Sequence, residues 1–243
     1  MIVRALLLVA LLVASVGASP AGFERWLVAG LSSLVLVSYF RAWRLRERLQ
    51  RSMQEARVDD VLESLRAQTQ GQDEGVYQLL SATALAAFGY VEKARRGLAQ
   101  LERSAVVRTA LEQRLIAEVL LDVFEGARDD ALRKVSLLES LPLPRGMIDK
   151  KVALLRRGIA SFVRAFSHLA LPGDDARLRG AAKEIPLIAW AMRYARAIVA
   201  IDSGRASDVA GLLADAPAWP QGSAYHDYHA ELLSRALAHP DKR

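Results

Sequence analysis

The sequence has no cysteine among its 243 residues. Disulfide bonds and thiolate metal sites are therefore excluded, and the composition is compatible with a reducing compartment. The chain also lacks the GxxxxGK[ST] and GxGxxG patterns that cradle phosphates, and the GxSxG pattern of a nucleophile elbow. No catalytic motif of these types is present, so we expect neither an enzyme nor a bound cofactor.

Alternation of polar and apolar residues with a period of two is almost absent, so no β-strands are expected. Apolar residues recur instead at steps of three and four, which is typical of helices packed on one face. With 52% hydrophobic residues, the chain has ample material for a domain core. The sequence therefore predicts an all-α protein.

Net positive charge is small in most of the chain, although the formal net charge of the whole chain is +6. Residues 1–40 contain two arginines and one glutamate, and residues 41–57 contain six arginines and two glutamates. Residues 58–243 are left with a net charge of only +1. That balance provides no overall basic field, so nucleic acid is not an expected partner.

Charge is missing altogether from two N-terminal runs, Ala5 to Phe23 and Trp26 to Phe40. As a helix rising about 1.5 Å per residue, the first run roughly matches a hydrocarbon core of about 30 Å. Pro20 and Gly22, near the end of the first run, favour a tight reversal before the second run. Residues 1–40 are predicted to form a transmembrane hairpin of two helices in the lipid bilayer.

The second run is shorter, with 15 residues, but its flanks extend its reach. Tryptophan favours the membrane interface, and arginine can extend its charged head outward from the end of a span. The predicted membrane-flank residues are Trp26, Arg41, Trp43, Arg44, Arg46, Arg48 and Arg51.

Orientation follows from the basic residues, because Lys and Arg are retained on the cytoplasmic side. Arg4 precedes the first run, the loop between the runs has no net charge, and the arginine-rich flank follows the second. We expect both ends of the hairpin to lie inside, which places the protein in the cell (inner) membrane with its C-terminal domain in the cytoplasm.

A second interpretation of the N-terminus stays open. Residues 1–18 have the parts of a cleaved signal peptide: Arg4 as the basic start, an apolar centre, and Val16-Gly17-Ala18 as a small-residue cleavage site. One span would then remain. The basic flank keeps the rest of the chain in the cytoplasm under either interpretation.

Residues 41–74 are predicted to form a basic juxtamembrane helix and linker, whose arginines would hold anionic headgroups. A short helix from Asp59 to about Gln68 lies within this segment. Residues 75–243 are predicted to form a helical-repeat domain with a C-terminal capping helix. Its predicted helices are Gly75 to Val91, a partner from Val91, Val107 to Glu125, Asp129 to Leu141, a third pair ending near Ile185, Pro186 to Ile201, Ala206 to Ala214, and Tyr225 to Ala238.

The third pair begins with a buried apolar stripe whose residues follow steps of four and three. These are Leu155, Ile159, Phe162, Phe166 and Leu169.

Glycines mark the expected turns inside the helix pairs. Gly89, Gly126, Gly173 and Gly204 are separated by 37, 47 and 31 residues. Helical hairpins that cannot bury their apolar faces alone gain a continuous core by stacking. The predicted fold after the membrane helices is therefore an α-solenoid of stacked helical hairpins.

Two segments, Gly89 to Ala94 and Gly126 to Ala131, share the spacing from a turn glycine to an alanine in the second helix. This spacing resembles a degenerate tetratricopeptide-type repeat. Both units lack the first-helix aromatic of that family, and Val209 stands where the fourth unit would have the alanine.

The resemblance implies a concave groove lined by the first helices, which would bind an apolar helix of a partner or of this chain. The matching partner-binding positions are Leu79, Thr83, Ala86, Ile116, Leu120 and Val123. The alternative is that these six residues belong to the core.

A metal site is suggested by His226 and His229, one helical turn apart, with Glu231 close by. Zinc catalysis needs at least three converging ligands and an open position. An amphipathic end helix explains the same segment, so no metal is expected there. His168, at the end of an apolar helix, is interpreted as structural.

Other charged groups have simple structural interpretations. Asp129 with Asp130, and Asp174 with Asp175, stand at expected helix starts, where the backbone dipole favours them over a catalytic role. A basic cluster is interpreted as a solvated face rather than a phosphate or acidic-peptide site. It comprises Lys150, Lys151, Arg156, Arg157 and Arg164.

Together these features predict a membrane-anchored, non-enzymatic scaffold or adaptor that binds protein partners on the cytoplasmic face. One alternative is a metal-dependent enzyme using the C-terminal histidines. Another is a structural subunit of a larger membrane complex.

Overall fold

The computed structural model describes residue 44 and residues 47–101, 110–143 and 149–238. Within these ranges the chain is helical and contains no β-strand, which confirms the all-α prediction. Both uncharged runs lie outside them, as do the flank residues Trp26, Arg41, Trp43 and Arg46. Of the helices that are described, none has the length and apolar character needed to cross a membrane.

The chain divides between Leu49 and Gln50, and Gln50–Arg243 forms one compact unit. Helix α3 (Val58–Gln68) packs against α4 (Glu74–Ala87) inside this unit. Val61 of α3 is fully buried. The structural boundary therefore falls 25 residues before the predicted boundary at Gly75, because the apolar face of α3 is covered by the repeat domain.

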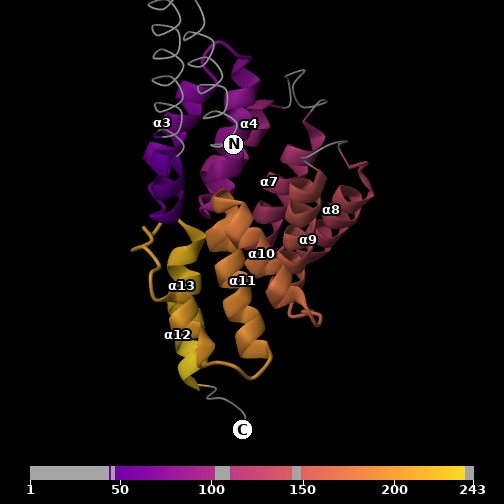
Figure 1. Cartoon of the computed structure of the whole chain (residues 1–243), viewed down its shortest axis with the longest axis vertical. Helices are drawn as coiled ribbons and strands as arrows, with labels where there is room; N and C mark the ends of the chain where they lie inside the picture. The colour runs from indigo at the N-terminus through magenta and orange to yellow at the C-terminus, as the bar shows by residue number, and fades with distance from the viewer. Residues whose placement is uncertain (1–43, 45–46, 102–109, 144–148, 239–243) are drawn as a thin grey trace, which may run out of the picture. The chain divides into compact units, whose positions relative to one another are not determined.

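Four helical hairpins follow, in the order predicted. They are α4 with α5 (Val91–Leu101), α7 (Leu111–Phe124) with α8 (Arg128–Ser140), α9 (Asp149–Phe166) with α10 (Asp174–Glu184), and α11 (Ala189–Asp202) with α12 (Asp208–Leu213). A 3-10 turn, Pro186–Ile188, precedes α11. The first helices pack in sequence, α4 on α7, α7 on α9 and α9 on α11, so the hairpins are stacked (Figure 1).

The turns inside the hairpins share one backbone conformation. Their glycines have φ between +72° and +90°, a region that residues with a Cβ rarely adopt. The residue five positions after each glycine is fully buried in the second helix. These four residues are Ala94, Ala131, Leu178 and Val209. The glycine and the buried position recur in all four hairpins, including the two where the sequence pattern is weaker.

The apolar stripe of α9 is shorter than predicted. Ile159 and Phe162 are fully buried and Phe166 lies at the edge of the core, but Leu169 is 56% exposed. Helix α9 ends at Phe166, and His168 turns the chain away with φ +57°. Leu169 therefore leaves the helical register and is not a core residue.

The first residues of the C-terminal helix α13 (Ala224–Ala238) contact the ends of several first helices. The Tyr225 hydroxyl donates to the Ala87 carbonyl oxygen at 3.0 Å, and its ring lies 5.3 Å from that of Phe124. Tyr228 packs its ring 5.3 Å from that of Phe166. Since Ala87, Phe124 and Phe166 end α4, α7 and α9, the start of α13 contacts the ends of three first helices. Helix α13 also packs against α11 and α12, the last hairpin of the array. Figure 1 shows α13 in yellow beside α11.

Close packing of α9 on α10 at Gly158 gives a first prediction. A Cβ at Gly158 would lie 2.5 Å from the Ala181 Cβ, so Gly158→Ala should force the helices apart and lower the free energy of unfolding by about 1–3 kcal/mol. Gly211→Ala, in α12, is the matched control. A Cβ there meets nothing within 4 Å, and the change should be neutral or stabilising by up to about 1 kcal/mol. Urea denaturation followed by circular dichroism measures both, and equal effects would contradict the close approach.

Candidate functional site

The six predicted groove residues lie in the core. Each is 6% exposed or less, and α4 and α7, which carry them, pack against each other. Helix α13 also covers the C-terminal ends of both helices. Of the two alternatives given above, the structure therefore has the core arrangement for Leu79, Thr83, Ala86, Ile116, Leu120 and Val123. A partner helix cannot reach these side chains without opening the fold.

The C-terminal histidines take part in packing. His226 Nδ1 lies 2.9 Å from the Trp219 carbonyl oxygen, which can only accept, so this nitrogen donates. His229 Nδ1 lies 3.0 Å from the Tyr194 hydroxyl oxygen. Among the residues described, no group of three or more His, Asp or Glu side chains is placed to hold a metal ion. His168 Nδ1 lies 2.8 Å from Asp202 Oδ2 and connects two turns.

The basic cluster of α9 is divided between several structural roles. Arg156 is buried, where Nε donates to Glu112 at 2.8 Å and Nη1 to the Leu141 carbonyl at the end of α8. Arg164 binds a buried carboxylate of α10. Lys150 and Lys151 are exposed. The cluster does not form one site, because its members face different neighbours around the helix.

The buried carboxylate is that of Asp174, which is fully enclosed. It accepts hydrogen bonds from Arg164, Arg177, the Ser161 hydroxyl and the Leu171 N–H. Burial alone would raise the pKa of this carboxyl, but these hydrogen bonds outweigh burial and hold its pKa well below its usual range. The interpretation of Asp174 as a simple helix cap is therefore incomplete, because its carboxylate also connects α9 to α10.

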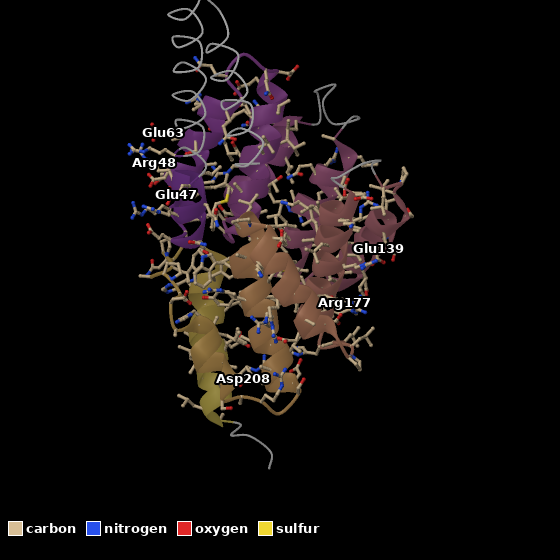
Figure 2. The ribbon with its side chains drawn as sticks, in the orientation of Figure 1. Glu47, Arg48, Glu63, Glu139, Arg177 and Asp208 are labelled. Atoms are coloured by element: carbon tan, nitrogen blue, oxygen red, sulfur yellow. The ribbon has the colours of Figure 1, made fainter. Side chains whose placement is uncertain are left out.

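Several other charged side chains lie at the surface. Glu63, Glu139 and Asp208 are examples in Figure 2, and all three are exposed. Exposed charges of this kind contribute little to stability. A binding site for a charged ligand is expected where several charges of one sign line the same cavity.

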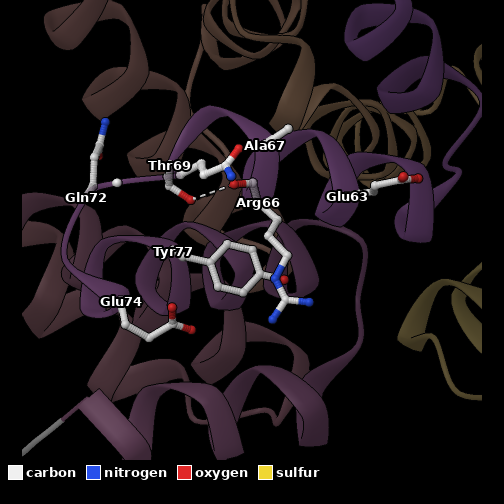
Figure 3. Close-up of a pocket in the computed structure, with 9 residues that line it drawn as sticks. Glu63, Arg66, Ala67, Thr69, Gln72, Glu74 and Tyr77 are labelled. Carbon is white, nitrogen blue, oxygen red and sulfur yellow. Dashed lines mark hydrogen bonds between the residues drawn. The ribbon is translucent and has the colours of Figure 1, made fainter.

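One cavity, of about 490 Å³, lies at the turn between α3 and α4 (Figure 3). Arg66 lies over the ring of Tyr77 at 5.4 Å, and Thr69 Oγ1 donates to backbone carbonyls of α3. The carboxylates of Glu63 and Glu74 also line it. With one cation opposed by two carboxylates, this cavity has no charge selectivity for an anion.

A second cavity, which we call the basic pocket, has a volume of about 670 Å³ and lies between α10, the start of α11 and residues 50–54. Four cations line it: Arg179 and Lys183, one turn apart on α10, and Arg193 and Arg196, one turn apart on α11. The remaining lining residues are Gln50, Gln54, Ala182, Pro186, Ala189, Trp190 and Asp215.

Two carboxylates hold the arginines of the basic pocket in place. Asp175 Oδ1 accepts from Arg196 Nε at 2.9 Å, and its Oδ2 accepts from Arg179 at 2.6 Å. Asp215 Oδ1 accepts from Arg193 Nη1 at 2.5 Å. Burial raises the pKa of Asp175, but the two arginines outweigh it and hold that pKa below its usual value. Four cations against two carboxylates leave the basic pocket with a net positive charge.

Trp190 forms an aromatic wall of the basic pocket. Its Nε1–H donates to the Gln54 carbonyl oxygen at 2.9 Å and so fixes residues 50–54 against α11. The Arg193 guanidinium lies 4.7 Å from the centre of the same ring, and Trp219 packs edge-on against it at 5.8 Å. The indole therefore positions both the N-terminal side of the basic pocket and one of its arginines.

Comparison with known protein families, with curated protein sequences and with solved structures finds no match.

The basic pocket was missed by reasoning from the sequence because its residues are spread from Gln50 to Asp215. The cations of α9 lie closer together in the sequence but do not form one site. The sequence does contain one pattern that indicates the basic pocket. Arg193 and Arg196 interrupt an otherwise apolar helix at a spacing of three, which puts two cations on one face of a helix that is largely buried.

Proposed function

We propose that the protein is a membrane-anchored, non-enzymatic scaffold or adaptor that binds protein partners on the cytoplasmic face through its stacked helical hairpins. The observation that carries this proposal is the order of the chain. Two uncharged runs come first, an arginine-rich flank follows, and the compact helical unit begins at Gln50. A helical body attached directly to a membrane anchor is suited to holding other proteins at that surface.

The recurrence in the hairpins supports a repeat of the tetratricopeptide type. A positive-φ glycine followed five residues later by a fully buried side chain occurs four times. Stacked hairpins of this type present extended surfaces for recognition. Because α13 covers the ends of α4, α7 and α9, the proposed protein contacts lie on the outer surface of the hairpins.

The orientation is tested by reporter fusions. A reporter fused after Arg243 should be active only as a cytoplasmic domain, because the arginine-rich flank retains the following chain inside. The same reporter placed after Gly22, in the expected reversal before the second uncharged run, should behave as external and serves as the control. Digestion of the C-terminal domain by a protease added to intact cells would contradict the proposed orientation.

The adaptor role is tested by recovery of partners from membranes. The full chain with a C-terminal tag is isolated in mild detergent, with and without prior cross-linking in the membrane. An unrelated soluble domain fused to residues 1–57 is the control. Proteins recovered only with the helical unit and only after cross-linking support a transient adaptor. Fixed stoichiometry without cross-linking indicates a structural subunit, and recovery of the chain alone in both preparations contradicts partner binding.

A further inference from the structure

We propose that the basic pocket binds a phosphate-bearing anion, either the headgroup of an anionic lipid or a free phosphate ester. Arg179 and Lys183 of α10 and Arg193 and Arg196 of α11 supply the charge. Arginine presents several N–H donors in a planar arrangement that matches phosphate oxygens, and lysine adds a mobile point charge.

The two deeper arginines retain donors for a ligand. Among the hydrogen bonds of the described residues, Arg196 uses Nε towards Asp175 and Arg193 uses Nη1 towards Asp215. A guanidinium has five N–H donors, so the remaining ones are available to an anion. The carboxylates and the Trp190 ring hold both groups in position, which reduces the conformational entropy lost when a ligand binds.

The outer two cations of the basic pocket, Arg179 and Lys183, are the more exposed ones. The Arg179 side chain is 66% exposed although it contacts Asp175, and Lys183 is exposed and forms no ion pair with any described residue. Gln50 and Gln54 line the other side, where amide groups supply neutral donors. The basic pocket thus combines two partly buried arginines with two exposed cations at its rim.

The position of residues 50–54 in the chain favours a ligand at the membrane surface. Ten residues separate Gln50 from Phe40, the last residue of the second uncharged run, and ten residues span at most about 36 Å in any conformation. If that run crosses the bilayer, the basic pocket stays within reach of the headgroups. The lipid source therefore rests on the proposed membrane anchoring, whereas the phosphate chemistry of the basic pocket does not.

The experiment uses the full chain in nanodiscs of zwitterionic phosphatidylcholine at low ionic strength, titrated with inorganic phosphate by isothermal calorimetry. The variant Arg179→Glu/Lys183→Glu should bind phosphate at least about tenfold more weakly than the natural chain, because it replaces two cations of the basic pocket with carboxylates. Arg133→Glu/Lys151→Glu is the matched control. Arg133, like Arg179, is an exposed helical arginine paired with an aspartate one turn away, and the control variant has the same net charge. It should bind within about twofold of the natural chain.

A second set of nanodiscs, in which part of the lipid is anionic phosphatidylglycerol, distinguishes the two sources. If a headgroup occupies the basic pocket, it competes with phosphate and weakens apparent phosphate binding at least about fivefold in the natural chain. Unchanged phosphate affinity assigns the basic pocket to a free phosphate ester.

Two results would overturn the inference: the absence of saturable phosphate binding by the natural chain, or an equal loss in the Arg133→Glu/Lys151→Glu control. Circular dichroism verifies that each variant is folded. Anchoring is measured separately, by co-elution of the chain with the nanodiscs. If the chain does not co-elute, the proposed anchor fails, while the phosphate titration can still be carried out in buffer.

Discussion

Replacement of Phe162 by alanine is expected to lower the free energy of unfolding by about 3–5 kcal/mol. The Phe162 ring is fully buried, with the rings of Phe124 and Phe166 at 6.0 and 4.8 Å. Truncation would remove the apolar area that this ring buries and leave a cavity between α7 and α9, two first helices that pack on each other. Chemical denaturation of the full chain in mild detergent, followed by circular dichroism, measures the loss.

Leu169→Ala is the control for this prediction. Leu169 belongs to the same sequence stripe as Phe162 but is more than half exposed, so its truncation should change the unfolding free energy by no more than about 0.5 kcal/mol. An unchanged denaturation midpoint for Phe162→Ala would show that α9 does not pack on α7 in this way. An equal loss for Leu169→Ala would show that α9 continues past Phe166.

The contrast between Phe162 and Leu169 shows what a local pattern can determine. Apolar residues at steps of three and four identify the buried face of α9, because a helix repeats every 3.6 residues. They do not identify where the helix ends. That end depends on the backbone at His168, whose positive φ removes Leu169 from the face that the pattern assigns to it.

The hairpins themselves were predictable because their information is local. Each turn needs a residue that adopts positive φ, and glycines at Gly89, Gly126, Gly173 and Gly204 provide it. Helix bounds follow within a few residues from these turns and from Pro142, Pro172 and Pro186.

Contacts between distant segments were not predictable in the same way. The hydrogen bond from Tyr225 to Ala87 joins residues 138 apart, and the one from Trp190 to Gln54 joins residues 136 apart. Neither is implied by the amphipathic pattern of its own helix. For that reason the predicted groove residues lie in the core where α4 and α7 pack together, and the basic pocket forms only through the packing of α10 and α11 beside residues 50–54.

The hydrogen bonds of Asp174 were likewise not predicted from the sequence. Replacement of Asp174 by alanine is expected to lower the unfolding free energy by about 3 kcal/mol. This value is at the low end for a broken buried ion pair, because Arg164 and Arg177 retain some exposure and can turn towards solvent. Ser161 is fully buried and cannot turn towards solvent. Its hydroxyl would therefore lose the carboxylate that accepts its hydrogen bond, and no water could take that place.

Asp130→Ala is the matched control for Asp174→Ala. Asp130 occupies the first turn of α8, as Asp174 does in α10, but its pair with Arg133 is exposed. The control should lose no more than about 1 kcal/mol. Equal losses in denaturation experiments would mean that both aspartates act only as helix starts.

The pH dependence of the unfolding free energy tests whether the charge of Asp174 stabilises the fold. Asp174→Asn is the test variant, because asparagine has nearly the same shape but no charge. The pKa of Asp174 is lowered in the folded chain from an ordinary value of 3.8, so the unfolded chain takes up a proton at higher pH than the folded chain. The stability supplied by the carboxylate is therefore fully present above that value and is lost as the pH falls through it towards the folded pKa. The difference in unfolding free energy between the natural chain and Asp174→Asn should be constant above about pH 5 and should shrink below pH 3.8. A difference that stays constant down to the acid unfolding transition would show that the ionised carboxylate does not stabilise the contact between α9 and α10.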